Sequence, residues 1–255
     1  MAGPNQRRNT LTFDIGGTGL KAAVLGPTGK MLTDRHRIAT PHPLTPAGLV
    51  EQLRALAGPL PEVHRISAGF PGVVRHGRLL TAHNFVGVCG PGSTPDPALV
   101  SAWRGFDLAS ALVGAFGVPA RVVNDADLQG FDVVAGHGVE VVITLGTGVG
   151  SALFDDGRLA PHLELAHHPF RKGETYEEQL GELALRRVGP RSWNRRLRRA
   201  IETIDTLLLF DRLYVGGGNA RHIDFELPPR VQRISPNAGL LAGIKLWRRS
   251  GARAR

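Results

Sequence analysis

Apolar runs of strand length alternate with glycine- and proline-rich turns along the first half of the chain. These runs predict strands over residues 10–15, 22–25, 31–37, 65–69 and 121–123. Two longer segments have apolar residues at helical spacing and predict helices over residues 46–56 and 106–116. The turn Gly117-Val118-Pro119 is where we expect the first domain to end.

The second half opens with an apolar hairpin over residues 141–154. The pattern then predicts two helices, a strand and a final helix, over residues 176–187, 191–208, 212–215 and 237–248. We therefore expect two domains, residues 1–119 and residues 120–255.

A glycine-rich turn follows the first strand. Asp14 stands at its rim, and Gly16 and Gly17 lack a Cβ, so the backbone N–H groups can approach an anion closely. Thr18 adds a hydroxyl donor and Lys21 a positive charge. Because a carboxylate repels phosphate, Asp14 needs Mg²⁺ or its water shell between them. The turn predicts a phosphate-binding loop with a metal-facing acid, although such a turn alone is common.

The hairpin of the second half repeats this arrangement. A strand runs into Gly146-Thr147-Gly148, and a second strand returns after Gly150. Two such hairpins suggest a duplicated architecture that holds one polyphosphorylated ligand. A third turn, Gly216-Gly217-Gly218, could let a nucleotide base or another ligand lie flat.

Five motifs in this order resemble the ROK family of sugar kinases: Asp14-Ile-Gly-Gly-Thr18, Asn124-Asp125-Ala126-Asp127, Leu145-Gly-Thr-Gly-Val-Gly150, Glu164-x-x-His167 and Gly216-Gly-Gly218. Within the family, the chain is most similar to the short polyphosphate-type glucokinases. The resemblance implies an α/β fold of the actin-like, ribonuclease-H-like ATPase class, with two domains and a cleft between them. It also implies that the final helix packs back on the first domain.

The Asn124-Asp125 pair is the centre of the expected chemistry. A carboxylate at the end of an interior strand can accept the proton of a sugar hydroxyl, and a neighbouring amide can hold an adjacent hydroxyl. Asp125 is then the general base and Asn124 the orienting residue. The alternative is a turn that caps the next helix, with Asp127 as the more typical cap.

The resemblance implies further sugar contacts from Asn84, Glu164, His167 and Glu177. Glu178 competes with Glu177, and Ala166 stands where the family prefers glycine. The implied donor site consists of both loops, Lys21 and Gly217, with Asp14 holding Mg²⁺ directly or through water.

The function implied is transfer of a phosphoryl group from polyphosphate and/or ATP to the 6-hydroxyl of glucose. A kinase for mannose, fructose or an N-acetylhexosamine would use the same residues. A DNA-binding ROK regulator would need a helix-turn-helix before the first loop, where only residues 1–8 precede the first strand. A sensor that binds sugar without catalysis is the remaining alternative. We expect a homodimer that binds neither nucleic acid nor membrane.

The net charge of +9 is concentrated in one segment, whose arginines are Arg186, Arg187, Arg191, Arg195, Arg196, Arg198 and Arg199. They form either a solvated helix face or a groove for a polyanion. Trp193 is the only ring among them, which disfavours nucleic acid. Further arginines end the chain at Arg248, Arg249, Arg253 and Arg255.

The single cysteine, Cys89, excludes an intramolecular disulfide and favours a reducing, cytoplasmic location. No cysteines follow His167, and His162, His167 and His168 have poor spacing for zinc, so we expect no zinc site. Residues 86–102 depart from the family pattern, and their glycine and proline content predicts a loop.

Overall fold

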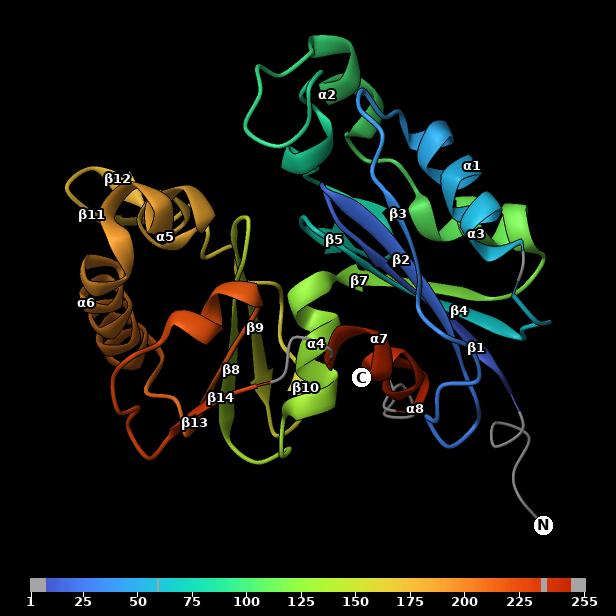
Figure 1. Ribbon diagram of the computed structural model, residues 1–255. Coiled ribbons are helices and arrows are strands. Elements are labelled where there is room, and N and C mark those ends of the chain that lie inside the picture. The colour runs from blue at the N-terminus through green and yellow to red at the C-terminus, as the bar shows by residue number, and fades with distance from the viewer. Residues whose placement is uncertain (1–7, 59, 235–237, 249–255) are drawn as a thin grey trace. The chain divides into compact units, whose positions relative to one another are not determined.

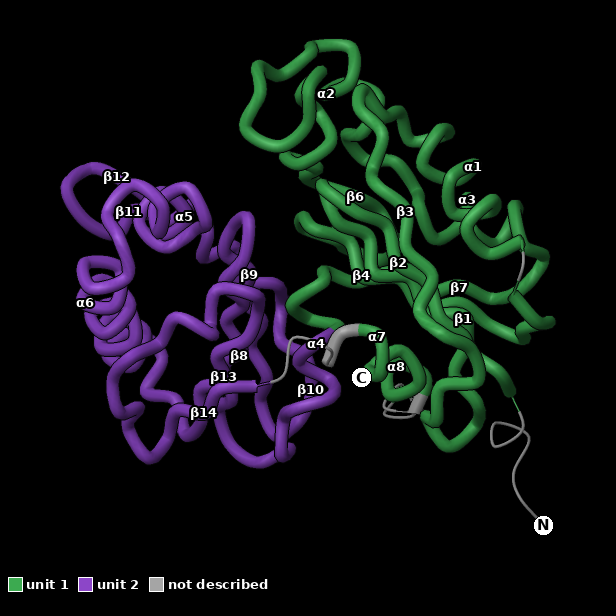
Figure 2. The backbone as a smooth tube through the Cα atoms, in the orientation of Figure 1, with its two compact units in different colours: residues 1–128, 239–255 green, residues 129–238 purple. Residues whose placement is uncertain are grey.

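The computed structural model describes residues 8–58, 60–234 and 238–248 (Figure 1). The chain forms two compact units, residues 1–128 with 239–255, and residues 129–238 (Figure 2). Of the predicted features, Asn237 and the side chains of the C-terminal arginines lie outside the described residues. No helix in the described ranges combines the length and the apolar character needed to cross a bilayer.

Unit 1 is built on a five-stranded sheet in the order β3-β2-β1-β4-β7. Its strands are β1 (Thr10–Ile15), β2 (Gly19–Leu25), β3 (His36–Ala39), β4 (Arg65–Phe70) and β7 (Ala120–Asn124). β1, β2 and β3 form an antiparallel meander, whereas β1, β4 and β7 are parallel. The parallel strands end at the same edge of the sheet, where the first glycine loop and the Asn124-Asp125 pair both lie.

The two faces of this sheet differ because side chains alternate along each strand. Leu11 and Phe13 are level with Ile66 and Ala68 and belong to the apolar core with α1 (Pro46–Ala57) and α3 (Leu108–Phe116). On the other face, buried polar side chains meet the C-terminal segment, which consists of α7 (Ala238–Leu241), a 3₁₀ turn (Ala242–Ile244) and α8 (Lys245–Arg248).

Specific contacts hold this C-terminal segment on unit 1. The Ser67 hydroxyl donates to the carbonyl of Gly243 over 2.7 Å and accepts from the indole N–H of Trp247 over 2.9 Å. Arg121 donates to the carbonyl of Leu246, and its guanidinium lies 4.2 Å from the centroid of the Trp247 ring. The C-terminal segment therefore packs on unit 1, although residues 129–238, which form unit 2, separate it in sequence from the rest of that unit.

The segment predicted as a loop is partly helical. Residues 97–103 form α2 (Pro97–Trp103), whose N-cap is Asp96: its carboxylate accepts from the N–H of Ala98. Pro97 stands at the first helical position, where its missing N–H costs nothing. The buried ring of Trp103 lies 5.2 Å from the ring of Phe85, centroid to centroid, in a tilted arrangement that anchors the helix to the core. The prediction of a loop was wrong because the glycine and proline content of the segment hides the Asp96-Pro97 pair, which is a signal for the start of a helix. A short hairpin, β5 (Val74–Arg75) and β6 (Arg78–Leu79), precedes this segment.

Unit 2 repeats the sheet pattern of unit 1. Its sheet has the order β10-β9-β8-β13-β14, with the antiparallel strands β8 (Val139–Leu145), β9 (Val149–Asp155) and β10 (Arg158–Leu159) and the parallel strands β13 (Arg212–Gly216) and β14 (Val231–Arg233). In each sheet, a meander around a glycine loop is followed by parallel strands. This confirms the duplicated architecture that the two loops suggested.

Helices and a small hairpin complete the elements. The hairpin is β11 (Pro169–Arg171) with β12 (Glu174–Thr175), and the helices are α4 (Asp125–Val133), α5 (Tyr176–Leu180) and α6 (Glu182–Leu208). α6 kinks at Gly189, which has φ 73°, directly before Pro190. The kink lies between the two helices that the sequence predicted, and Gly181 makes a second break that was not predicted.

Candidate active site

The first glycine loop is held from outside by two side chains. The Thr40 hydroxyl donates to the carbonyl of Gly16 over 2.6 Å, and Nε2 of His42 lies 2.7 Å from the carbonyl oxygen of Gly17. A Cβ on Gly17 would lie 2.7 Å from Pro91 and 2.8 Å from Asn84, so only glycine fits there. The predicted sugar contact Asn84 and residues of the 86–102 segment therefore pack directly against the first loop.

Asp14 and Lys21 form a cross-strand pair. They face each other on β1 and β2, and the Lys21 ammonium lies 2.7 Å from the Asp14 carboxylate. Both side chains stay partly accessible, with exposed fractions of 34% for Lys21 and 28% for Asp14. Thr18, the predicted hydroxyl donor of the loop, is exposed. The first glycine loop, a cation and an acid thus lie together in unit 1.

Parallel pairing brings Asp125 to the same sheet edge as Asp14. Asp14 is level with Gly69 on β4, and Gly69 is level with Val123 on β7, two residues before Asp125. At this position, burial raises the pKa of Asp125 to about 7, with further raising contributions from the charges of Asp14 and Asp127. A hydrogen bond from the N–H of Ala126 opposes the shift. A carboxyl group that titrates near neutral pH is suited to general base catalysis.

Asn124 caps the helix that carries Asp125. Its side-chain oxygen accepts from the N–H groups of Ala126 (2.8 Å) and Asp127 (3.3 Å), and its amide donates to the carbonyl of Gly72 over 3.0 Å. The side chain is 5% exposed. The cap of α4 is therefore Asn124, and the sequence reading that favoured Asp127 is corrected. Its amide fixes the start of α4, so it positions Asp125 whatever it does toward a sugar.

The second loop, in unit 2, is supported by its own set of contacts. The carbonyl of Gly146 accepts from the N–H of Glu182 at the start of α6 (2.9 Å) and from the side-chain amide of Asn219 (3.0 Å). Thr147 is exposed. Gly217, in the third turn, has φ 84° and packs against the backbone of Leu145 directly before the loop. The third turn thus supports the second loop.

Glu177 lies against the second loop and Glu178 does not. The Glu177 carboxylate accepts from the N–H of Val149 over 3.3 Å, and a Cβ on Gly148 would clash with it. Glu178 instead forms a capping box with Thr175, and its exposed carboxylate bonds the N–H and hydroxyl of that residue. Between the two candidates, the geometry favours Glu177.

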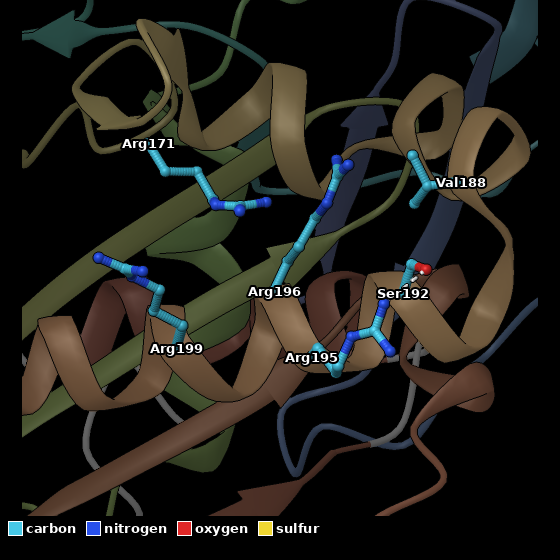
Figure 3. A pocket seen from close by; sticks show the side chains of 6 residues that line it. All are labelled: Arg171, Val188, Ser192, Arg195, Arg196 and Arg199. Carbon is cyan, nitrogen blue, oxygen red and sulfur yellow. Dashed lines mark hydrogen bonds between the residues drawn. The ribbon is translucent and has the colours of Figure 1, made fainter.

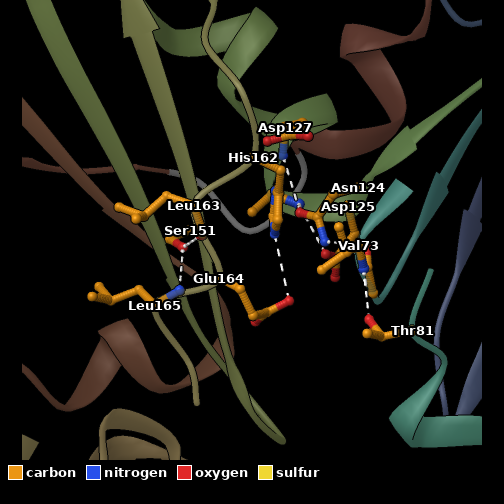
Figure 4. A network of polar contacts seen from close by, with 12 residues as sticks. Val73, Thr81, Asn124, Asp125, Asp127, Ser151, His162, Leu163, Glu164 and Leu165 are labelled. Atoms are coloured by element: carbon orange, nitrogen blue, oxygen red, sulfur yellow. Dashed lines mark hydrogen bonds and ion pairs between the residues drawn. The ribbon is translucent and has the colours of Figure 1, made fainter. Parts of the chain in front are cut away.

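The remaining predicted sugar contacts stand on the segment between β10 and α5. Figure 4 shows the Ser151 hydroxyl donating to the carbonyl of Leu163 and accepting from the N–H of Leu165, which fixes Glu164 between them. The Glu164 carboxylate lies 3.6 Å from Nε2 of His162. His167 is exposed. The carbonyl of Ala166 accepts from the N–H of Glu177 over 3.0 Å, so this segment and α5 are joined.

Each unit thus brings its own predicted residues together. Unit 1 gathers Asp14, the first loop, Asn84 and Asp125, and unit 2 gathers the second loop, Gly217, Glu177 and the segment of Glu164 and His167. Sequence reasoning missed three supporting residues: Thr40, His42 and Asn219. Their partners lie 24, 25 and 73 residues away in sequence, and only Asn219, directly after the third glycine turn, stood beside a recognised motif.

The acidic groups of unit 1 fit a Mg²⁺ ion that is bound partly by the protein and partly by the donor phosphates. Among the described residues, no group of three or more His, Cys, Asp or Glu side chains could hold a metal by itself. Mg²⁺, however, commonly takes one or two protein carboxylates and completes its shell with phosphate oxygens and water. The accessible carboxylate of Asp14, close enough to Asp125 to raise its pKa, meets that requirement.

Comparison with known proteins gives one family and one fold. The sequence model of the ROK family matches residues 10–161. The polyphosphate glucokinase of Mycobacterium tuberculosis (strain H37Rv) is 27% identical over 237 residues, 89% of this chain and 83% of that protein. An N-acetylmannosamine kinase of Escherichia coli (strain SMS-3-5) is 34% identical over 158 residues, 59% of this chain and 48% of that protein.

Among solved structures, the inorganic polyphosphate/ATP-glucomannokinase of Arthrobacter sp. strain KM superposes with a TM-score of 0.79 at 28% identity, covering 93% of this chain and 97% of that one. This likeness confirms the predicted α/β fold of the actin-like ATPase class.

Proposed function

The chain belongs to the ROK family, and from that premise we propose that it is a sugar kinase that transfers a phosphoryl group from polyphosphate and/or ATP to the 6-hydroxyl of glucose. The observation that carries the proposal is Asp125. It stands at the end of a parallel strand, at the sheet edge that also bears a glycine loop, and its pKa is raised to about 7. A base with a pKa near neutral pH assists attack by a sugar hydroxyl, whereas a carboxylate with a purely structural role has no need of such a pKa.

In this proposal, Asp125 accepts the proton of the attacking hydroxyl. Asn124 fixes the first turn of α4 and so orients the Asp125 carboxylate. Asn84, Glu164, His167 and Glu177 bind the other hydroxyls, with Asn124 as a further candidate contact. Phosphoryl transfer depends mainly on positioning and charge neutralisation, and these polar groups would supply the positioning on the sugar side.

The donor phosphates would be held by backbone N–H groups and hydroxyls of the loops Gly16–Thr18 and Gly146–Gly148, with Lys21 adding positive charge. Gly217 would act by supporting the second loop. Mg²⁺, held by Asp14 directly or through water, would neutralise charge on the donor phosphates. Among the relatives, one protein is named for polyphosphate and another for polyphosphate and ATP, which supports both donors.

The first test is formation of sugar phosphate from glucose and Mg²⁺, with ATP and polyphosphate as parallel donors. We expect glucose 6-phosphate, measured by coupled oxidation with glucose-6-phosphate dehydrogenase. Mannose, fructose and N-acetylmannosamine are assayed beside glucose, with their phosphates detected by mass spectrometry, since the E. coli relative acts on an N-acetylhexosamine by its name. Product from one of these alone would replace glucose as the substrate. No product from any sugar with either donor would contradict the kinase and leave a sugar-binding regulator.

Catalysis should depend on pH through Asp125. The base accepts a proton only when it is ionised, so kcat/KM should be constant above pH 7 and fall about tenfold per pH unit below it. Mg²⁺ near Asp14 adds positive charge and should move this limb to lower pH as its concentration rises. The measurement is kcat/KM between pH 5 and 9 at two Mg²⁺ concentrations. A flat profile across pH 5–7 would contradict a base of raised pKa.

Two further expectations complete the proposal. We expect a homodimer, which sedimentation velocity of the purified chain tests, and a monomer at micromolar concentration would contradict it. We also expect a cytoplasmic location, for which the single, exposed Cys89 is the supporting observation. Secretion of the chain with its source cells intact would contradict that location.

A further inference from the structure

Unit 2 contains a pocket that none of the groups above uses. It has a volume of about 540 Å³, within the size range of ligand sites, and it is lined by Arg171, Val188, Ser192, Arg195, Arg196 and Arg199. Figure 3 shows the guanidinium groups of Arg171, Arg196 and Arg199 around one opening between β11 and α6. Four of its six lining residues are arginines and none is acidic.

The arginines come together because of helical spacing. Residues 192, 195, 196 and 199 recur at intervals of three and four, so they share one face of α6 after its kink at Gly189. Val188 lies just before the kink, and Arg171 approaches from β11. Arg195 and Arg199 are one turn apart, and like charges at this spacing destabilise a helix. On a solvated surface helix, glutamates placed among the arginines would reduce this repulsion. None of the residues that line the pocket is acidic.

The hydrogen bonds of the pocket do not neutralise its charge. Arg171 donates to the side-chain carbonyl of Gln179, Arg196 to the backbone carbonyl of Gln179 and Arg195 to the hydroxyl of Ser192. Each of these acceptors is neutral. Among the described residues, no carboxylate lies within ion-pair distance of the four lining arginines.

The nearest acids are already occupied. Glu174 pairs with Arg187 over 3.1 Å and also accepts from Gln179, and Glu178 caps α5. Partial burial and, after it, the positive charges of Arg171 and Arg187 lower the pKa of Arg196, with Glu174 opposing. The pocket thus holds unneutralised positive charge, which an anion would relieve.

We propose that this arginine pocket binds inorganic oligophosphate, as the part of a polyphosphate chain that lies beyond the phosphate being transferred. Guanidinium groups bind phosphate oxygens through paired hydrogen bonds, and Ser192 offers a further donor. The lining contains no aromatic ring on which a base could stack, which favours phosphate over single-stranded nucleic acid.

The separation between the pocket and the second loop, both in unit 2, suits a polyphosphate of several units and not a single phosphate. Glu182, at the start of α6, donates to the carbonyl of Gly146 in the second loop. Ser192 follows ten residues later, on the order of 15 Å along a helix at about 1.5 Å per residue, and less because of the kink at Gly189. Only an extended polyanion could occupy the loop and the pocket together. This kinetic part rests on the proposed function, whereas binding to the pocket does not.

The test compares two double variants of the full chain with equal charge change. Arg195→Gln/Arg199→Gln removes two lining residues, and Arg158→Gln/Arg212→Gln removes two exposed arginines of unit 2 outside the pocket. Binding of fluorescent long-chain polyphosphate is measured by anisotropy at fixed salt, with inorganic triphosphate and a single-stranded RNA of equal charge as competitors. KM is then measured for long-chain polyphosphate and for ATP.

The pocket variant should bind long-chain polyphosphate at least about tenfold more weakly, with an equal rise in its KM for that donor and an unchanged KM for ATP. The control variant should stay within about twofold of the unsubstituted chain. Polyphosphate binding that is weakened equally in both variants, or in neither, would overturn the proposal that the pocket binds oligophosphate. RNA that competes as well as polyphosphate would overturn its assignment to oligophosphate. If the unsubstituted chain has no kinase activity but binds polyphosphate, and the pocket variant loses that binding, the proposed function is refuted and the proposed pocket is supported.

Discussion

Replacement of Asp125 by asparagine is expected to lower kcat by about 10²- to 10⁴-fold, the range that a general base contributes. The amide keeps the shape and polarity of the side chain but cannot accept the proton of the sugar hydroxyl. Glucose binding should survive, because the groups proposed to bind the sugar are unchanged. The measurements are steady-state kinetics and calorimetric titration with glucose.

A matched control separates loss of the base from general damage to unit 1. Asp96→Asn makes the same chemical change at the N-cap of α2, where asparagine caps as well as aspartate. Its kcat should stay within about twofold of the original value. If Asp125→Asn kept more than about a tenth of kcat, Asp125 could not be the general base.

The same variant should be more stable than the original chain at neutral and alkaline pH. The pKa of Asp125 in the folded protein is about 7, against 3.8 for the unperturbed group, so the folded state holds this proton more tightly than the unfolded state does. Its ionisation therefore costs stability progressively as pH rises from about 4 to 7, and the full cost is present above pH 7. Asparagine removes the cost.

The sign of this effect can be checked by melting. The Tm of Asp125→Asn should exceed that of the unsubstituted chain by several degrees at pH 8, and the difference should vanish toward pH 4, where Asp125 is protonated. A difference that is independent of pH would mean that the gain comes from hydrogen bonding and not from removal of a buried charge. Activity and stability are thus expected to oppose each other at this residue.

Sequence patterns predicted the strands best where apolar alternation ends at glycine. The bounds of β1, Thr10–Ile15, are those that the pattern predicted, because a buried face and a glycine turn define both ends. The strand predicted over residues 31–37 was wrong: Met31 makes only an isolated bridge to Leu25, and β3 begins at His36. Its position is set by pairing with β2, and this long-range register leaves no local signal.

The candidate site shows the same division. The loop glycines and Asp125 could be proposed from the sequence because their signals are local: a turn that needs glycine and an acid at a strand end. The sequence did not identify Asn124 as the cap of α4, because asparagine and aspartate cap helices equally well. The choice between Asn124 and Asp127 depends on where β7 ends, which is at Asn124. Thr40 and His42 escaped notice because they act through carbonyls of a loop that is distant in sequence. The pocket arginines were visible as a cluster, but their shared face required the helix and β11 together.

Gly217→Ala should destabilise unit 2 by at least about 3 kcal/mol and weaken the donor site with it. Gly217 has φ 84° and ψ 166°, a conformation open almost only to glycine. An added Cβ would lie 2.2 Å from the carbonyl oxygen and 2.5 Å from the nitrogen of Leu145. Because both contacts are to backbone, relief requires moving the end of β8 and with it the second loop.

The neighbouring glycine provides the control. A Cβ on Gly218 would meet nothing within 4 Å, so Gly218→Ala should leave stability and donor KM close to their original values. Chemical denaturation compares the variants, and hydrogen exchange at Leu145 and Gly146 reports whether the loop itself loosens. Equal behaviour of the two alanine variants would show that the third glycine turn does not support the second loop. If only Gly217→Ala loosens the loop and raises KM for both donors, the run of glycines acts as a structural support for phosphate binding, through backbone packing and not through contact with the donor.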